Sequence, residues 1–475
     1  MLNTLNDVLN NVDNFIWGMP LIILILFTGI LLTVRLRGLQ VRHLGKALHY
    51  VFHNEDDGEG EVTSFGALCT ALSATIGTGN IVGCATAIVA GGPGALFWMW
   101  LAAFFGMATK YAEGMLAVKY RVIAEDGHAL GGPFYYIEKG MGKNFKWLAK
   151  LFCVFGTMVG LFGIGTFTQV NGITSAVNNF FDPSNVHTIS LFGMNYSISV
   201  VVAGIIVTVC AGLVIIGGIK RISKVSEVIV PFMAVTYIGV CLIIVFTHLP
   251  QVPAAFVQIV QSAFGLKAAA GGAIGAMTVA MQKGIARGIF SNEAGLGSAP
   301  IAAAAAQTNE PVRQGLVSMT GTFIDTIIVC TMTGLAIVMT GAWDMGLEGV
   351  AVTTKAFALG LPFPAKASAF ILMMCLVFFA FTTILGWAYY SERCLEYLVN
   401  GKRFIITAFK WLYILAVFIG PFMTVSAVWT IADICNGLMA FPNLVALLAL
   451  NGDVVSETRG YLERVGIVKT TVGEA

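Results

Sequence analysis

The sequence predicts an all-α polytopic membrane protein, and three observations support this fold class. Of its 475 residues, 57% are hydrophobic and only 11% are charged, whereas a soluble globular domain carries about 25% charged residues. Its apolar runs reach the length of a membrane-spanning helix, about 20 residues, and do not alternate as the strands of a transmembrane barrel do. Its basic residues gather in alternate loops, as in multi-pass membrane proteins.

Eleven apolar runs are long enough to be membrane spans. The stretch before the first run contains no Lys or Arg, so it lacks the positive region of a signal peptide, and the run is expected to remain as an extra N-terminal helix. The predicted spans cover about 15–35, 66–90, 94–119, 145–178, 197–216, 225–247, 270–306, 311–340, 365–397, 404–419 and 421–449.

The distribution of basic residues orients these spans. Loops on one side hold most of the Lys and Arg, and the other side holds only Lys267, Lys355 and Lys366. The positive-inside rule then places the N-terminus outside and the C-terminus in the cytoplasm of a multi-pass plasma-membrane protein, in a bacterial or archaeal inner membrane. Segments 132–141 and 253–264 are expected to lie on the membrane surface, and 450–475 to form a polar cytoplasmic tail.

The second span contains the run Gly-Thr-Gly-Asn at 77–80. A helix in lipid is expected to be unbroken, because lipid offers no partner to a free N–H or C=O group. Two glycines beside an Asn weaken the helix at mid-membrane depth, and such a break persists only where the freed groups line a cavity or bind a ligand. The alternative is close helix packing, which explains most of the 54 glycines.

A second glycine-rich run, at 284–297, interrupts the seventh span, five spans after the first interruption. This spacing predicts two five-helix repeats of opposite orientation, with discontinuous helices 2 and 7. Paired interrupted helices indicate the binding site of a secondary transporter. The predicted organisation is an extra span at 15–36, a first repeat at 65–248, a second repeat at 249–449 and a tail at 450–475.

Other function classes find less support. The six histidines and nine cysteines have no metal-ligand spacing, and there is no P-loop. We therefore expect no enzyme activity, no organic cofactor and no metal other than a transported Na⁺. A channel would favour repeated subunits and rings of carbonyls, and saturable uptake would exclude it. Nucleic acid and obligate protein partners are not expected; the partners are a small neutral amino acid and the lipid bilayer.

Two long motifs carry a family resemblance. GGPGALFWMW at 91–100, continued by LAAFFG at 101–106, and ARGIFSNEAGLGSAP at 286–300 resemble signatures of the alanine or glycine:cation symporter family, also called the sodium/alanine symporter family. The resemblance extends over nearly the whole chain. It implies a leucine-transporter-like fold and symport of alanine or glycine with Na⁺ or H⁺ by alternating access. Another neutral amino acid, such as glutamine or serine, is the alternative substrate.

A zwitterionic amino acid needs partners for both of its charges. The half-helix that begins near Asn80 offers the amides of Thr78 and Gly79 to the carboxylate, and the ends of the broken halves offer carbonyls to the ammonium group and the cation. Gln169 lies in a polar patch of an apolar run, so it faces the cavity or forms a helix–helix hydrogen bond. Predicted substrate-binding residues are Gly77, Thr78, Gly79, Asn80, Gln169, Phe290, Ser291, Asn292, Thr383 and Trp387.

The cation site is implied by resemblance to the leucine-transporter pattern. Backbone carbonyls and hydroxyl groups suit Na⁺, which is a hard cation. Thr383 and Trp387 are four residues apart and share a helix face, so Trp387 either closes the substrate pocket or belongs to the core. Predicted cation ligands are the carbonyls of Ser73, Ile76 and Phe379, together with Thr382 and Thr383.

Charged residues inside spans also need an explanation. Lys110 and Glu113 are three residues apart, which favours a structural ion pair near the cytoplasmic end of their helix. Lys283, Arg287 and Glu293 surround the second interruption and are interpreted as an inner-gate or structural charge cluster. If protons drive transport, the candidate carboxylates are Glu293, Asp325 and Asp433.

Overall fold

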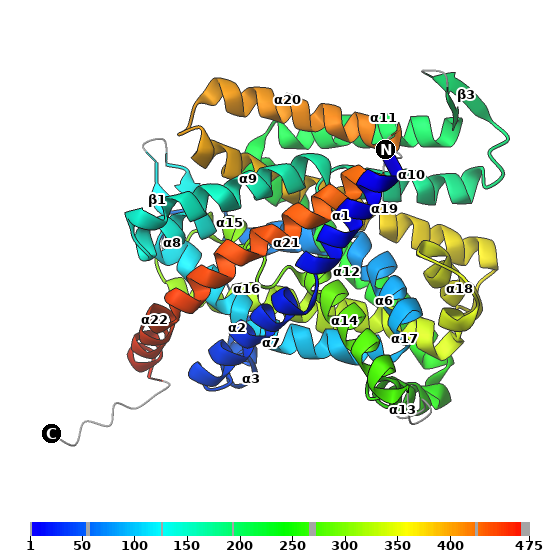
Figure 1. Cartoon of the computed structure of the whole chain (residues 1–475), viewed down its shortest axis with the longest axis horizontal. Helices are drawn as coiled ribbons and strands as arrows, with labels where there is room; N and C mark the ends of the chain where they lie inside the picture. The colour runs from blue at the N-terminus through cyan, green and yellow to red at the C-terminus, as the bar shows by residue number, and fades with distance from the viewer. Residues whose placement is uncertain are drawn as a thin grey trace.

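The computed structural model describes residues 2–53, 58–124, 127–191, 194–265, 272–422 and 426–466, which are mostly helical (Figure 1). Two antiparallel hairpins occur, β1 (Val122–Ile123) with β2 (Ala129–Leu130) and β3 (Thr188–Leu191) with β4 (Met194–Ser197). The helices are α1 Leu2–Ile16, α2 Met19–Arg35, α3 Leu39–Arg42, α4 Leu44–Phe52, α5 Ser64–Thr75, η1 Gly79–Gly83, α6 Cys84–Gly91, α7 Gly94–Lys119, α8 Pro133–Gly140, η2 Lys143–Phe145, α9 Lys146–Phe162, α10 Phe167–Phe181, α11 Ile198–Ile215, α12 Gly218–Thr247, η3 Leu249–Gln251, α13 Val252–Ala263, α14 Ala273–Asn292, α15 Pro300–Ala303, α16 Pro311–Thr322, η4 Phe323–Cys330, α17 Thr331–Thr340, η5 Ala342–Asp344, α18 Val350–Gly360, α19 Ala365–Leu398, α20 Arg403–Ile419, η6 Gly420–Phe422, α21 Ser426–Ala449 and α22 Asn451–Arg464.

The helix lengths and hydropathies are those of a polytopic membrane protein. Among the described residues, eight helical stretches are long and apolar enough to cross a membrane. A ninth candidate is the bent pair formed by α5 and the segment Gly79–Gly91, whose halves meet at 52°. The chain is therefore an all-α polytopic membrane protein. Helices α7 and α14 occupy the other two predicted spans but are not among these nine, so the number eleven stays a prediction.

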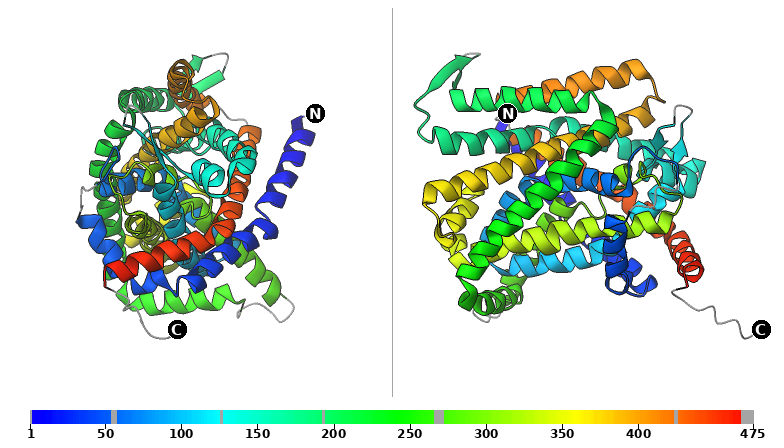
Figure 2. Two further views of the ribbon diagram at one scale, coloured as in Figure 1. Left: turned by 90° about the vertical axis from the view of Figure 1, so that its left-hand side faces the viewer. Right: turned by 180° about the vertical axis from the view of Figure 1, so that it is seen from behind.

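The bundle has an outer and an inner group of helices. Only a third of the apolar window of α11 and of α12 is buried, whereas two thirds of that of α16 with η4 and α17 is buried. Exposed side chains on α12 include Phe232 and Val235, which suits contact with lipid. In the interior, α7 packs against α14 and α16, and α19 packs against α9 and α10 (Figures 1 and 2). The interrupted helices lie in this inner group.

Glycines allow the inner helices to approach closely. A Cβ added at Gly284 of α14 would overlap the carbonyl oxygen of Ala95 in α7. A Cβ added at Gly386 of α19 would lie 2.6 Å from the Cβ of Ala74 in α5. Small residues at such crossings bring the backbones of membrane helices together. Packing is thus the role of these two glycines.

The two interruptions differ in how well the sequence located them. Helix α5 ends at Thr75 and the π-helix η1 begins at Gly79, so residues 76–78, here called the first break, overlap the predicted run 77–80, whose last two residues belong to η1. The prediction for 284–297 was wrong for its first part, because α14 continues through Asn292. The second break is residues 293–299. The glycines of α14 serve packing against α7 and do not unwind the helix.

Two further irregularities were not predicted. The long span expected at 145–178 is divided between α9 and α10 by residues 163–166, the third break. The span expected at 311–340 contains the π-helix η4 (Phe323–Cys330). The segment expected on the membrane surface at 132–141 forms α8, whose Pro133, Phe134, Tyr136 and Ile137 are buried where it packs against α7, α9 and α21. Helix α13 is amphipathic, as expected.

Both ends of the described chain form helices. Helix α1 runs beside α21 (Figures 1 and 2). Helix α22 follows α21 and packs against α7 and α16. Its Tyr461 hydroxyl lies 2.6 Å from the hydroxyl of Tyr50, and Thr458 Oγ1 lies 2.6 Å from the hydroxyl of Tyr111. The segment after residue 450 is therefore attached to the bundle as far as residue 464.

Candidate functional site

In the first break, the amides of Gly77 and Thr78 have no helical carbonyl as acceptor. Side-chain oxygens accept their hydrogen bonds instead. The Gly77 amide donates to Asn80 Oδ1 at 2.9 Å, and the Thr78 amide donates to Gln169 Oε1 at 3.4 Å. Thr78, Asn80 and Gln169 are all buried. The second of these bonds is longer than the usual 2.7–3.2 Å. A ligand oxygen that replaced Gln169 Oε1 would therefore lose little.

The second break is longer and more constrained than the first. Glu293, Gly295 and Gly297 adopt φ values of 56°, 91° and 81°; for a non-glycine residue such as Glu293 this left-handed conformation is unfavourable. The Gly295 amide donates to Glu113 Oε1 at 3.0 Å, and Asn443 Nδ2 donates to the Gly295 carbonyl at 2.9 Å. Asn443 also bonds to Glu113 Oε1 at 2.6 Å. Side chains from α7 and α21 thus hold this backbone in place.

The first break meets the end of α14 face to face. A Cβ built at Gly79 would lie 3.4 Å from the Phe290 ring and 3.5 Å from the Cα of Ser291. These distances are those of ordinary van der Waals contact, so position 79 lies directly beside the end of α14. Predicted substrate residues from two distant parts of the sequence are adjacent here.

A buried carboxylate, Asp325 of η4, connects the same elements. Its oxygens accept hydrogen bonds from Asn80 Nδ2 at 2.8 Å, Ser291 Oγ at 2.8 Å and Thr326 Oγ1 at 2.7 Å. Sequence reasoning singled out Asp325 only as a possible proton site. Its signal was a lone carboxylate inside an apolar run, but nothing in the sequence placed it beside Asn80.

The oxygens predicted to hold a cation fall into two groups. Thr383 Oγ1 lies 3.5 Å from the Ile76 carbonyl oxygen and 3.0 Å from the Phe379 carbonyl oxygen. These three oxygens are brought together at the first break. Thr382 Oγ1 instead bonds to the Phe379 and Phe378 carbonyls at 3.0 and 3.1 Å, so this hydroxyl bonds within its own helix. The Ser73 carbonyl belongs to the last turn of α5, just before the first break.

Gly77 is required for this arrangement. A Cβ at position 77 would lie 2.5 Å from Thr383 Oγ1 and 3.4 Å from Gln169 Oε1. Any larger residue would push α19 away from the first break. Gly77 therefore brings the amides, Gln169 and Thr383 into one small buried region.

Two predicted residues point elsewhere. Asn292 Nδ2 donates to Thr326 Oγ1 at 3.1 Å, and Asn292 Oδ1 accepts from the Ala294 amide at 2.9 Å, so this side chain stabilises the start of the second break. Trp387 Nε1 donates to Glu293 Oε1 at 3.0 Å. Trp387 therefore connects α19 to the second break.

The third break was missed by sequence reasoning. The hydroxyl of Tyr413 donates to the Gly165 carbonyl at 2.7 Å, and Thr166 Oγ1 donates to the Leu161 carbonyl at 2.7 Å. Helix α10 restarts at Phe167, which brings Gln169 to the first break. The available signals were the excessive length of the apolar run and its Gly163-Ile164-Gly165 sequence.

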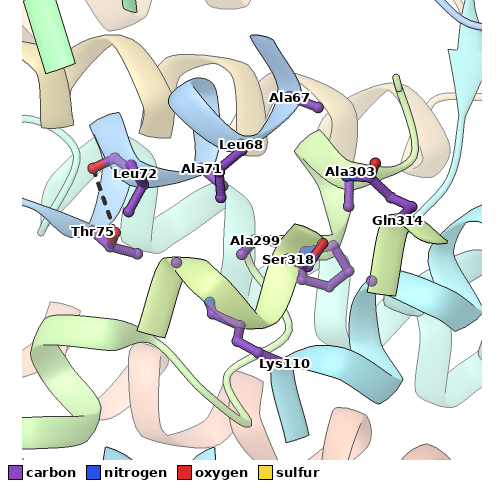
Figure 3. A pocket seen from close by; sticks show the side chains of 13 residues that line it. Ala67, Leu68, Ala71, Leu72, Thr75, Lys110, Ala299, Ala303, Gln314 and Ser318 are labelled. Carbon is purple, nitrogen blue, oxygen red and sulfur yellow. Dashed lines mark hydrogen bonds between the residues drawn. The ribbon is translucent and has the colours of Figure 1, made fainter. Parts of the chain in front are cut away.

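The charged residues of the inner helices do not form the clusters that the sequence suggested. Lys110 Nζ has no hydrogen-bond partner among the described residues, and Glu113 supports the second break. Lys110 lines a cavity of about 10 Å³ between α5, α7, α15 and α16. This volume has room for about one water molecule. Figure 3 shows Thr75 and Gln314 at other walls of the cavity. Lys283 and Arg287 line a separate cavity, away from Glu293.

Comparison with known proteins identifies the family. A family model described as the sodium:alanine symporter family matches residues 2–472. The chain is 45% identical over 465 residues to the sodium/alanine symporter AgcS of Methanococcus maripaludis, covering 96% of this chain and 97% of that protein. It is 55% identical over 466 residues to an uncharacterized transporter of Haemophilus influenzae, covering 98% of each.

A relative with another named substrate also matches. The chain is 37% identical over 464 residues to the probable sodium/glutamine symporter GlnT of Bacillus subtilis, covering 97% of this chain and 91% of that protein. The family resemblance in the two glycine-rich motifs is thus confirmed over the whole chain. Residues 2–472 carry the family pattern, so the chain belongs to the sodium:alanine symporter family, a family of membrane transporters and not of enzymes.

Proposed function

We propose that this protein is a secondary active symporter that takes up alanine or glycine together with Na⁺ by alternating access. Its family and its 45% identity to a sodium/alanine symporter support the reaction class. The observation that carries the proposal is the first break, where amides bonded only to side-chain oxygens lie together with the oxygens of Ile76, Phe379 and Thr383. A plasma-membrane protein with such a buried polar centre is suited to moving a small zwitterion and a cation together.

In this proposal the substrate carboxylate binds the amides of the first break. The carboxylate would replace Gln169 Oε1 as the acceptor for the Thr78 amide. It would also accept a hydrogen bond from the Gly79 amide, near the positive end of the half-helix that starts there. Phe290 and Ser291, which contact Gly79, would form the opposite wall. A region bounded this tightly favours a side chain no larger than that of alanine.

Na⁺ would bind the carbonyl oxygens of Ile76 and Phe379 and the hydroxyl of Thr383, with Ser73 and Thr382 completing the shell after rearrangement. Moving one charge through 100 mV supplies about 2.3 kcal/mol, and with a tenfold Na⁺ gradient the total is roughly 3.7 kcal/mol. One cation could therefore hold a substrate gradient of about a few hundredfold. That is sufficient for nutrient uptake.

A second candidate substrate is glutamine, because one relative is named a probable sodium/glutamine symporter; serine is a smaller alternative. H⁺ is the alternative coupling ion. In that case Asp325, which is fully buried beside the first break, is the carboxylate best placed to carry the proton, ahead of Glu293 and Asp433.

We also propose the membrane arrangement that follows from the loop charges. The N-terminus lies outside and the C-terminus in the cytoplasm. Residues 65–248 and 249–449 form two inverted five-helix repeats, residues 15–36 an additional span, and residues 450–475 the cytoplasmic end. Accessibility of single cysteines introduced near each terminus, measured in intact cells with an impermeant thiol reagent, tests the orientation.

The transport proposal is tested by counterflow in proteoliposomes. Labelled alanine, glycine and glutamine are offered to vesicles containing the purified protein, with Na⁺ or with K⁺ in its place. The expected result is saturable uptake of alanine or glycine that requires Na⁺. Flux that rises without saturation would indicate a channel, and Na⁺-dependent exchange of glutamine alone would replace the proposed substrate.

A further inference from the structure

A cavity of about 320 Å³ opens beside the N-terminal helix, between α1, α14 and α21. Helix α1 lies along α21 on one side of it (Figure 1). The indole Nε1 of Trp17 donates to the Asp433 carbonyl at 3.0 Å and joins the two walls. The volume falls in the range of small-molecule sites, about 300–1,000 Å³.

Opposite charges line opposing walls of this cavity. Asp13 of α1 and Asp433 of α21 supply carboxylates, and Lys283 and Arg287 of α14 supply positive charges. Arg287 is close enough to interact electrostatically with both carboxylates. Within the described part of the chain, however, no ion pair of 4 Å or less joins Arg287 to Asp13 or Asp433. The charges therefore face one another across open space.

Two of these charged groups are also positioned to interact with a ligand. Asp13 Oδ1 is buried and has no hydrogen-bond partner among the described residues. The guanidinium of Arg287 lies 5.5 Å from the centre of the Phe290 ring, a cation–π contact that orients the guanidinium. A buried carboxylate oxygen without a donor is costly, so a donor that enters the cavity is stabilised there.

One residue that lines the cavity, Phe290, also lies beside Gly79. Phe290 lines the cavity, and the same ring lies 3.4 Å from the position of a Cβ on Gly79. One aromatic side chain thus borders both the charged cavity and the start of η1, directly after the first break.

We propose that this cavity is an outer recognition site for a zwitterionic amino acid, separate from the site at the first break. Arg287 binds the carboxylate, and Asp13 and Asp433 bind the ammonium group. A simple anion or cation would leave one wall uncompensated, whereas a zwitterion neutralises both. The proposal rests on the proposed function, since it concerns the entry of the same substrate. The outer site needs no Na⁺, because the predicted cation ligands lie at the first break.

The test uses Asn14, which also lines the cavity. In the Asn14→Cys chain, reconstituted in vesicles, the labelling rate by a membrane-impermeant sulfonatoethyl methanethiosulfonate is measured in Na⁺-free medium with increasing L-alanine, glycine or L-glutamine. The parent chain corrects for its own cysteines. If the outer site exists, the transported amino acid slows labelling about tenfold at ten times its Kd, because only the empty site reacts.

Three controls sharpen the result. Alaninamide, which lacks the carboxylate, and N-acetylalanine, which lacks the ammonium group, should protect less than alanine. Arg287→Gln in the Asn14→Cys chain should abolish protection, measured as the ratio of its own labelling rates with and without alanine, because loss of the positive charge also alters the rate of the anionic reagent. Val8→Cys, an exposed position on α1 outside the cavity, should be labelled equally with and without alanine.

Na⁺-driven uptake in the same vesicles separates this proposal from the proposed function. Uptake without protection of Asn14→Cys would overturn the outer site and leave the symporter intact. Protection without uptake would support the outer site and contradict symport. Equal protection by alanine, alaninamide and N-acetylalanine would also overturn the outer site, because recognition would then not depend on both charges.

Discussion

The first and second breaks interrupt two helices of one bundle, yet they are built differently. The first break has three residues with no left-handed conformation, and its amides bond to the neutral side chains of Asn80 and Gln169. The second break has seven residues, three with positive φ, and its backbone is held by Glu113 and Asn443. A ligand can easily replace the 3.4 Å bond from the Thr78 amide to Gln169, whereas both bonds of Gly295 are 3.0 Å or shorter and one of them is to a carboxylate. We infer that the first break binds the substrate and that the second break stabilises the bundle around it.

The largest effect that this contrast predicts comes from Gly77. Gly77→Val would place side-chain atoms where Thr383 Oγ1 now lies and displace α19. We expect Na⁺-driven uptake to fall more than about 100-fold, because displacements near 1 Å at a binding site cost that much. Uptake in proteoliposomes is the measurement. Gly83→Ala is the matched control, since a Cβ there meets nothing within 4 Å. Normal uptake by Gly77→Val would refute the location of the site.

Glu113→Ala tests the supporting role of the second break. It leaves the buried Gly295 amide without an acceptor and removes one of the two acceptors of Asn443 Nδ2, which should reduce the free energy of unfolding by about 2–3 kcal/mol. Thermal unfolding in detergent measures the loss, and the KM of the folded fraction should be unchanged. Glu457→Ala, which removes a partly exposed ion pair with Lys119, should cost under about 1 kcal/mol. A changed KM with unchanged stability would contradict the contrast.

Thr383→Ala distinguishes the two threonines of α19. Removal of one of the oxygens near the first break should raise the Na⁺ concentration for half-maximal uptake about tenfold, equivalent to about 1.4 kcal/mol. Thr382→Ala is the matched variant, and its smaller expected effect follows from its bonds to the Phe378 and Phe379 carbonyls. Unchanged Na⁺ dependence in Thr383→Ala would exclude the proposed cation site.

The smallest predicted effect concerns Gln169. Because its bond to the Thr78 amide is long, at 3.4 Å, Gln169→Ala should change the KM for alanine only about threefold, within the net value of one hydrogen bond. Thr174→Ala on the same helix, whose hydroxyl bonds to the Val170 carbonyl, should leave KM unchanged. A much larger change for Gln169→Ala would mean that this side chain contacts the substrate.

The sequence predicted the fold class and the first break because both depend on local composition. Apolar length identifies spans, and Gly77 and Gly79 weaken a helix wherever it packs. The second break was misplaced because glycines have two roles: Gly284 and Gly288 lie within the continuous helix α14 and allow it to pack closely against α7.

The contacts of the site were harder to predict. In the fold, Asp325 lies beside Asn80, and Glu113 lies beside Gly295. These contacts depend on which helices become neighbours, and no local sequence pattern encodes that. The third break was hidden within a run apolar enough to pass for one helix. The sequence located polar residues inside the membrane but not their partners.

The attachment of α22 has a practical consequence for handling the protein. Its tyrosine and threonine hydroxyls bond to Tyr50 of α4 and Tyr111 of α7. A chain shortened at residue 450 would leave both phenols without these partners and tend to aggregate on extraction. Shortened chains should therefore retain α22 through Arg464.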